Sequence, residues 1–271
     1  MSQHNKQQPI GVYDSGIGGL TVAQAITRLL PHEQLIYFGD TAHLPYGDKS
    51  TAAIQAYSVK ICNLLIQQNC KVILIACNSA SAAAYDLVRE YVGSKAKILN
   101  VIDPAVNYIG QHYENKTVGL IGTKQTVHSN VYKKKIDALN KNVTLQSLAT
   151  PLLATMIEEG FFNNNISESV IAKYLSDPAL ERIEALILGC THYPLIKNQI
   201  NEFYQGQVDI VDASELVASH VKQFLVSNDL AANKMAKEHE FYVSDFTRSF
   251  EESTKLFFER EVNLEHYPLW E

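Results

Sequence analysis

Two cysteines occupy matching places in the chain, each directly after an apolar segment. Cys77 follows the run from residue 72 to 76, and Cys190 follows the run from residue 186 to 189. The residues after them carry amide, hydroxyl or imidazole groups: Asn78, Ser79, Thr191 and His192. We expect these residues to lie at helix N-termini, which lower the pKa of a cysteine. Because a thiolate accepts a proton and a thiol returns one, two opposed thiols could move protons on opposite faces of one carbon atom. The pattern therefore suggests acid–base chemistry by a pair of thiols.

Asp14 ends another apolar segment and, with His192, is a candidate to orient the two thiols or to exchange protons with them. Cys62 and Cys70 lie in and just after an amphipathic stretch, and we predict that both pack as small apolar side chains. The absence of CxxC spacing argues against a zinc knuckle. A mixed metal site built from the aspartate, the histidine and the two strand-end cysteines is a less favoured alternative, because it lacks a tight local pair of ligands.

Short β-branched runs alternate with amphipathic stretches along the chain. The predicted strands include residues 10–13, 35–38, 71–76 and 240–243. The predicted helices are residues 20–30, 50–69, 214–226 and a stretch starting at Ser79, and residues 39–49 form a predicted loop. Strands that are apolar on both faces and spaced by helices are typical of a parallel sheet covered on both sides. Ligands bind beyond the carboxyl ends of such strands, so we expect Asp14, Cys77 and Cys190 to face one crevice.

The second half of the chain repeats the plan of the first. Segment 118–123 resembles segment 10–15, and segment 186–191 resembles segment 74–79 with an offset of one residue. We predict two lobes of related design, with boundaries near residues 101–104 and 208–212. A last helix is predicted from the capping-box residues Ser249 and Glu252 and the apolar residues Phe250 and Phe257.

Composition bounds the function classes. Hydrophobic residues make up 46% of the 271 residues and charged residues 19%, which excludes a disordered chain. A net charge of −6 gives no reason to expect a nucleic-acid or membrane partner, and the short basic run Lys133–Lys135 is read as a solvated helix face. No apolar segment follows Met1, so we expect no signal peptide, a cytoplasmic location and reduced thiols.

The glycine-rich turn Gly16–Gly19 follows a strand, as phosphate-binding loops do. The GxGxxG register fails because Thr21 stands at the third glycine position, and Asp14 just before the turn would repel phosphate. We therefore do not expect a nucleotide site.

Several ordered segments resemble the glutamate racemase family, of the cofactor-independent aspartate/glutamate racemase superfamily. The segments are residues 10–22, 37–42, 45–47, 75–80 and 188–195, with further matches at Gly122-Thr123, Thr126-Val127, 151–153 and Glu158. The resemblance implies an α/β fold of two pseudo-symmetric lobes, each a mostly parallel sheet flanked by helices, with the active site in the crevice between them. It places residues 1–100 and 212–271 in the N-terminal lobe and residues 101–211 in the C-terminal lobe.

The resemblance also implies an activity and its residues. It implies interconversion of L- and D-glutamate for peptidoglycan synthesis, and hence for cell wall biogenesis and cell shape, without cofactor or metal, by a homodimer. Cys77 would take the α-proton of D-glutamate with help from Asp14. Cys190 would take that of L-glutamate with help from His192 and Glu158. The implied substrate contacts are Asp14, Ser15, Pro45, Tyr46, Gly47, Asn78, Ser79, Thr123, Thr126, Thr191 and His192.

Two other classes of protein compete with a racemase. A non-catalytic amino-acid-binding protein on a two-lobed scaffold would explain the crevice and the hydroxyls, but not two matched cysteines. A cysteine hydrolase or acyl transferase would pair Cys190 with His192. We expect residues two apart at a strand end not to make nucleophile–base contact easily, and Asp14 and Cys77 would have no role.

Overall fold

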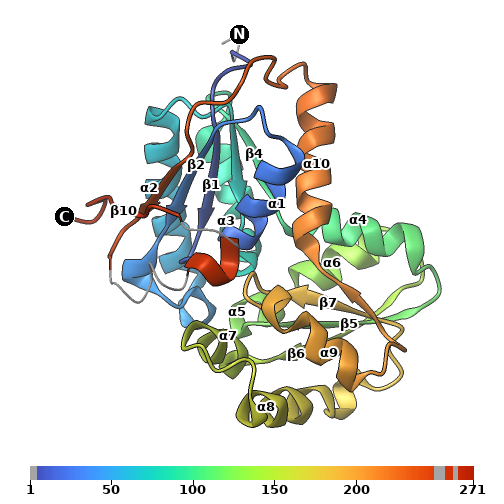
Figure 1. Cartoon of the computed structure of the whole chain (residues 1–271). Helices are drawn as coiled ribbons and strands as arrows, with labels where there is room; N and C mark the ends of the chain where they lie inside the picture. The colour runs from blue at the N-terminus through green and yellow to red at the C-terminus, as the bar shows by residue number, and fades with distance from the viewer. Residues whose placement is uncertain (1–4, 247–253, 259–261) are drawn as a thin grey trace.

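The chain forms two lobes stacked on one another, as Figure 1 shows. The structure is a computed structural model that describes residues 5–246, 254–258 and 262–271. The predicted capping-box residues Ser249 and Glu252 and the predicted apolar residue Phe250 lie outside the described residues, whereas Phe257 belongs to a helical segment at 254–258. Among the described residues, no helix is both long enough and apolar enough to cross a membrane.

A parallel sheet forms the centre of the upper lobe in Figure 1. Its strands are β1 (Ile10–Asp14), β2 (Leu35–Gly39), β3 (Val72–Ile75), β4 (Lys97–Asn100), β9 (Glu240–Val243) and β10 (Glu265–His266). They are ordered β10-β9-β2-β1-β3-β4, with every described neighbour pair parallel. The predicted strands at 10–13, 35–38, 71–76 and 240–243 correspond to β1, β2, β3 and β9.

The lower lobe repeats this arrangement. Its strands are β5 (Thr117–Gly122), β6 (Thr144–Ala149), β7 (Ala185–Gly189) and β8 (Asp209–Val211), in the order β6-β5-β7-β8 and again parallel. The order β2-β1-β3-β4 in the first sheet is the same pattern, with β5 in the place of β1 and β7 in the place of β3. The two segment resemblances in the sequence fall on these pairs, so the predicted repeat is confirmed.

Alternation along the strands divides the upper lobe into two apolar layers. Val12 and Leu74 pack on the face covered by α1 (Leu20–Leu29) and α10 (Ala213–Ser227). Tyr13 and Ile75 pack on the opposite face, against α2 (Thr51–Gln67) and α3 (Asn78–Val92). A strand residue and its successor point to opposite faces, so an all-apolar strand needs helices on both sides.

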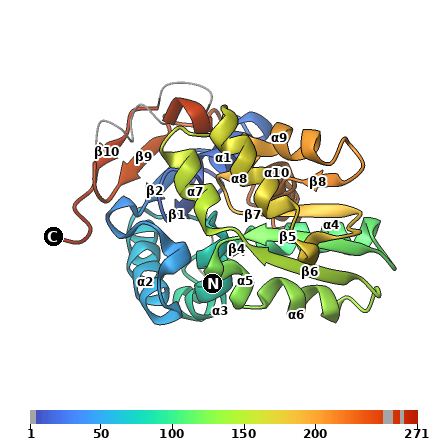
Figure 2. The same ribbon diagram turned by 90° about the horizontal axis from the view of Figure 1, so that it is seen from below.

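The remaining helices complete the lower lobe and its junction with the upper one. They are α4 (Ile102–His112), α5 (Lys124–His128), α6 (Val131–Ala138), α7 (Pro151–Glu158), α8 (Asn165–Leu175) and α9 (Lys197–Phe203). Figure 2 shows α7, α8 and α9 beside the lower sheet, on the side away from α5 and α6. The predicted loop 39–49 contains two short 3-10 helices, η1 (Thr41–His43) and η2 (Tyr46–Asp48), so it is more ordered than expected.

The chain changes lobe after β4 and after β8, because β1–β4, β9 and β10 share one sheet and β5–β8 the other. The predicted boundaries at 100/101 and 211/212 fall directly after these two strands. The assignment of each residue to a lobe stays a prediction.

Candidate active site

Cys77 lies where β3 meets α3. It is the N-cap residue of α3, and its Sγ accepts a hydrogen bond from the Ala80 backbone N–H at 3.4 Å. The thiol itself donates to Ser15 Oγ at 3.6 Å, which ties it to the end of β1. The predicted position of Asn78 and Ser79 at a helix N-terminus is confirmed, since α3 begins at Asn78.

The electrostatic state of Cys77 follows from its burial. A helix N-terminus ordinarily lowers the pKa of a cysteine. Here burial raises the pKa of the Cys77 thiol to about 12, reinforced by the charge of Asp14, while the Ala80 N–H and Ser15 only partly oppose this. In a dry site the cost of burying a thiolate exceeds the benefit from the helix terminus. Cys77 is therefore a protonated thiol in the free protein at neutral pH.

Asp14, at the end of β1, lies near Cys77 and stabilises the turn that follows β1. Its Oδ2 accepts hydrogen bonds from the backbone N–H groups of Gly16 and Gly19, each at 3.1 Å. Its Oδ1 is buried and has no hydrogen-bond partner among the described residues. Burial raises the pKa of the Asp14 carboxyl, and the nearby His192 partly lowers it again. Asp14 Oδ2 therefore fixes the turn that leads into α1. Its Oδ1 is left able to accept a proton or a hydrogen bond.

On the other lobe, Cys190 and His192 are in direct contact. Cys190 Sγ lies 3.5 Å from His192 Nδ1. The expectation that residues two apart at a strand end would not meet is wrong, because β7 ends at Gly189 and His192 has helical backbone angles (φ −81°, ψ −29°). That turn brings both side chains to the same side. A 3-10 helix, η4 (Tyr193–Ile196), follows, so Thr191 and His192 precede a 3-10 helix rather than beginning an α-helix.

Glu158, at the end of α7, approaches the other ring nitrogen. Its Oε1 lies 2.8 Å from His192 Nε2, an ion-pair distance that is out of line for a hydrogen bond. Burial alone would lower the pKa of the His192 imidazole. The Cys190 sulfur and the Glu158 carboxylate outweigh it and raise that pKa well above its ordinary value. The ring is therefore held as an imidazolium beside the Cys190 sulfur.

Three further contacts, which the sequence did not reveal, surround His192 and its neighbour Thr191. The Phe257 ring packs edge-on against the imidazole, with ring centres 5.3 Å apart. Gly18 lies so close that a Cβ there would be 2.5 Å from His192 Cε1. Thr21 Oγ1 donates to the Thr191 carbonyl at 3.2 Å. The glycine-rich turn thus brings the two lobes into close contact, which accounts for its glycines without a nucleotide.

Polar side chains of α3 and of the segment after β5 face each other across the lobes. Ser79 Oγ lies 2.8 Å from Thr123 Oγ1, which is in turn 3.1 Å from Thr126 Oγ1. Tyr132 OH donates to Asn78 Oδ1 at 2.8 Å. Because that bond occupies the amide oxygen, the Asn78 amide N–H groups are left to donate to a ligand.

A cavity lies between the lobes. The described residues that line it are Ser15, Leu44, Pro45, Tyr46, Gly47, Cys77, Asn78, Ser79, Thr123, Ala154, Glu158, Gly189, Cys190, Thr191 and His192. Two of the sequence-predicted site residues, Asp14 and Thr126, are not in this lining and lie behind it, and both are buried. Leu44, Ala154 and Gly189 were not predicted, because apolar wall residues have no chemical pattern in a sequence.

The lining suits a small ligand with carboxylate groups. It contains hydroxyls, an amide, a helix N-terminus and two thiols, and its described residues include neither lysine nor arginine. Neutral donors and a helix N-terminus can bind carboxylates. Cys62 and Cys70, by contrast, are buried in the apolar layer of α2 and lie outside this lining, which confirms their predicted packing. Among the described residues, no group of three or more His, Cys, Asp or Glu side chains could hold a metal ion.

Known proteins resemble the chain over nearly its whole length. The sequence profile of the Asp/Glu/Hydantoin racemase family matches residues 19–221. Glutamate racemase 3 of Caldanaerobacter subterraneus subsp. tengcongensis is 38% identical over 94% of this chain and 92% of its own. The glutamate racemase of Chlorobium phaeobacteroides is 38% identical over 96% of this chain and 97% of its own.

Solved structures give the same result. The crystal structure of glutamate racemase from Francisella tularensis in complex with D-glutamate aligns with a TM-score of 0.92 and 39% identity, covering 98% of this chain and 99% of that one. Aspartate racemase of Picrophilus torridus, at 18% identity, covers 92% of this chain and 99% of its own with a TM-score of 0.57, and so shares the fold.

Proposed function

The chain belongs to the glutamate racemases of the Asp/Glu/Hydantoin racemase family, and from this premise we propose that it interconverts L- and D-glutamate with two cysteines as the acid–base pair. The observation that carries the proposal is that Cys77 and Cys190, one from each lobe, line the same cavity. Two thiols on opposite walls can reach opposite faces of the α-carbon.

The environments of the thiols suggest how the reaction starts from each enantiomer. With L-glutamate, Cys190 takes the α-proton beside the His192 imidazolium, whose positive charge stabilises negative charge on the sulfur. Cys77, protonated in the free protein, delivers its proton to the opposite face of the α-carbon. With D-glutamate the direction reverses. Cys77 first passes its own proton to Asp14 Oδ1, and His192 returns a proton to Cys190. Cys77 then takes the α-proton as a thiolate and Cys190 delivers one. The two transfers leave the substrate with one proton removed and one added.

The neighbouring side chains have supporting roles in this proposal. Asp14 assists Cys77, since its charge lies close enough to affect the thiol. His192 and Glu158 assist Cys190. The substrate carboxylates and ammonium are bound by the predicted contact residues, of which Asp14 and Thr126 act from behind the wall.

Since the two thiols supply both proton transfers, the proposed mechanism needs no cofactor. We further propose that the D-glutamate serves peptidoglycan synthesis in the cytoplasm and that the enzyme works as a homodimer. All four cysteines are free of disulfides, which suits a reducing compartment.

Single substitutions test the pair of thiols. Cys77→Ser and Cys190→Ser should each lose racemisation of both enantiomers, because a serine hydroxyl is too weak an acid to replace a thiol. Cys62→Ala is the matched control, since this cysteine is equally buried but lies on α2, in an apolar layer away from the cavity. Racemisation measured by circular dichroism or chiral chromatography should survive only in the control. Full activity in either serine variant would overturn the proposal.

A further inference from the structure

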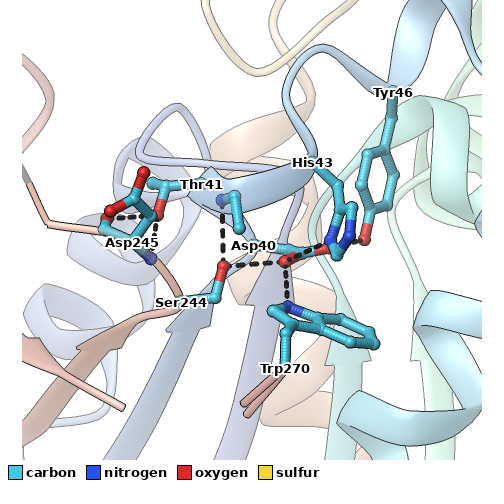
Figure 3. Close-up of polar contacts among 8 residues, drawn as sticks. Asp40, Thr41, His43, Tyr46, Ser244, Asp245 and Trp270 are labelled. Atoms are coloured by element: carbon cyan, nitrogen blue, oxygen red, sulfur yellow. Dashed lines mark hydrogen bonds and ion pairs between the residues drawn. The ribbon is translucent and has the colours of Figure 1, made fainter. Parts of the chain in front are cut away.

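The Asp40 carboxylate, just after β2, is fully buried and receives four side chains, as Figure 3 shows. Tyr46 OH donates to Oδ2 at 2.6 Å, and His43 Nδ1 lies 2.9 Å from the same oxygen. Ser244 Oγ and Trp270 Nε1 donate to Oδ1 at 2.8 and 2.7 Å. Hydrogen bonds offset the cost of burying a carboxylate, so these four contacts depend on one another through Asp40.

One of the four side chains, Tyr46, also lines the substrate cavity. It belongs to the segment 44–47, of which every residue faces the cavity. The C-terminal end of this segment rests on the lower lobe. A Cβ on Gly47 would lie 2.7 Å from Thr123 Cβ, and the next residue, Asp48, pairs with Lys124 at 3.1 Å. Segment 44–47 thus forms one wall of the cavity and contacts the lower lobe. Asp40 fixes this segment to the upper lobe.

Trp270 reaches Asp40 from a distant part of the chain. Residues 265–271 run along the sheet edge, where β10 pairs with β9 and Tyr267 N–H donates to the Val243 carbonyl at 2.9 Å. The indole then meets the His43 ring edge-on, with ring centres 4.5 Å apart. Lys60 Nζ lies 4.6 Å from the centre of the indole ring. The indole is thus fixed by packing as well as by its bond to Asp40.

We propose that Trp270 is a positioning residue of the substrate site, which holds segment 44–47 through Asp40 and Tyr46. The proposal rests on the proposed function in one respect, namely that this segment contacts glutamate. Trp270 touches no cavity residue that carries out proton transfer, so its contribution is to substrate binding. The segment 265–271 then belongs to the functional unit, although it lies far along the chain from both cysteines.

Trp270→Phe tests the proposal, because it keeps an aromatic ring and removes the N–H. Loss of one bond to a charged group should loosen segment 44–47 and raise KM for glutamate about three- to tenfold, with kcat changed less than about twofold. Tyr242→Phe is the matched control: it removes a hydroxyl bonded to Glu240 at 2.8 Å on the same sheet edge, and should leave KM unchanged. An unchanged KM in Trp270→Phe, or a loss confined to kcat, would overturn the proposal.

A double-mutant cycle separates positioning from general stability. Tyr46→Phe breaks the link between Asp40 and the cavity wall. If Trp270 acts through that link, adding Trp270→Phe to Tyr46→Phe should raise KM little further, whereas a merely structural effect would add in full. Racemisation by the wild type in the same assays tests the proposed function separately. The positioning role of Trp270 can therefore fail while the racemase activity holds, and the two outcomes can be told apart.

Fluorescence gives a second readout that needs no variant. Trp270 is the single tryptophan of the chain, so all tryptophan emission comes from this site. Titration of the wild type with glutamate should change that emission and saturate near KM. Emission that stays constant through saturation would contradict the coupling, and this result decides the matter if Trp270→Phe does not fold.

Discussion

Cys190 Sγ and His192 Nδ1 lie 3.5 Å apart, although only one residue separates them in the chain. The contact exists because the backbone turns directly after β7 and because Gly18 and Phe257 confine the ring on other sides. Its consequence is a charged imidazole beside one thiol, while the other thiol lies beside a buried carboxylate. The two halves of the site are therefore alike in fold and unlike in charge.

Replacement of that imidazole should slow catalysis. His192→Asn removes the positive charge beside Cys190, and we expect kcat to fall by about two orders of magnitude, the range of a lost acid–base group. The value of kcat/KM should fall equally for both enantiomers, since they have equal free energies in water. His112→Asn, on the exposed end of α4, is the control and should behave as wild type. Steady-state kinetics in both directions measure this effect. An unchanged kcat in His192→Asn would contradict the role of the imidazolium.

The close contact between the lobes should be sensitive to a single methyl group. A Cβ on Gly18 would lie 2.5 Å from His192 Cε1 and 2.6 Å from Thr191 Oγ1, so Gly18→Ala must displace the imidazole. We expect kcat/KM to fall more than about tenfold, because small misplacements of catalytic groups are costly.

Gly119→Ala is a matched control for that substitution. Its Cβ would meet two apolar side chains, Ile183 and Leu186, at 2.8 Å, but away from the cavity. It should lower the melting temperature and leave kcat/KM of the folded enzyme nearly unchanged. Equal activity losses in the two alanine variants would show that the Gly18 effect is not specific to the site.

The bond from Tyr132 to Asn78 should matter for binding. Tyr132→Phe frees the amide to rotate, and we expect KM for glutamate to rise about three- to tenfold, as for one lost hydrogen bond. Tyr204→Phe provides the comparison, because the Tyr204 hydroxyl is buried without a hydrogen-bond partner among the described residues. Its removal should leave KM unchanged and stability equal or higher. A normal KM in Tyr132→Phe would show that this bond does not orient Asn78.

The raised pKa of Cys77 predicts an unusual pH dependence of alkylation. Only the thiolate reacts with iodoacetamide, so the rate should keep rising between pH 8 and 11, about tenfold per pH unit, without the plateau near pH 9–10 of an ordinary cysteine. Mass spectrometry of the peptide containing Cys77 in the glutamate-free protein measures this rate. A plateau below pH 10 would mean that burial does not control this thiol.

The sequence predicted those site residues that lie at the carboxyl ends of strands. The rule that ligands bind beyond the carboxyl ends of parallel strands was enough to bring Cys77 and Cys190 to one crevice, and the repeated segments predicted the matching strand orders. Hydrophobic patterning on both faces of β1 and β3 required helices on both sides, as observed.

Contacts between residues far apart in the chain could not be predicted from those patterns. Phe257 against His192 and Trp270 on Asp40 join residues far apart in the chain, and neither aromatic residue differs locally from one that only packs. The pKa of Cys77 was also not predictable, since the helix N-terminus and burial act in opposite directions and only the structure shows that burial is the larger.

The most direct test of the two-thiol mechanism follows the α-proton in D₂O. Protiated L-glutamate is incubated with the wild-type enzyme, the reaction is stopped early, and each enantiomer is analysed by mass spectrometry after chiral separation. With one thiol on each face, the D-glutamate formed should carry deuterium at the α-carbon while the remaining L-glutamate keeps its protium. D-glutamate that retains the original protium would show that a single base serves both faces, and would contradict the account.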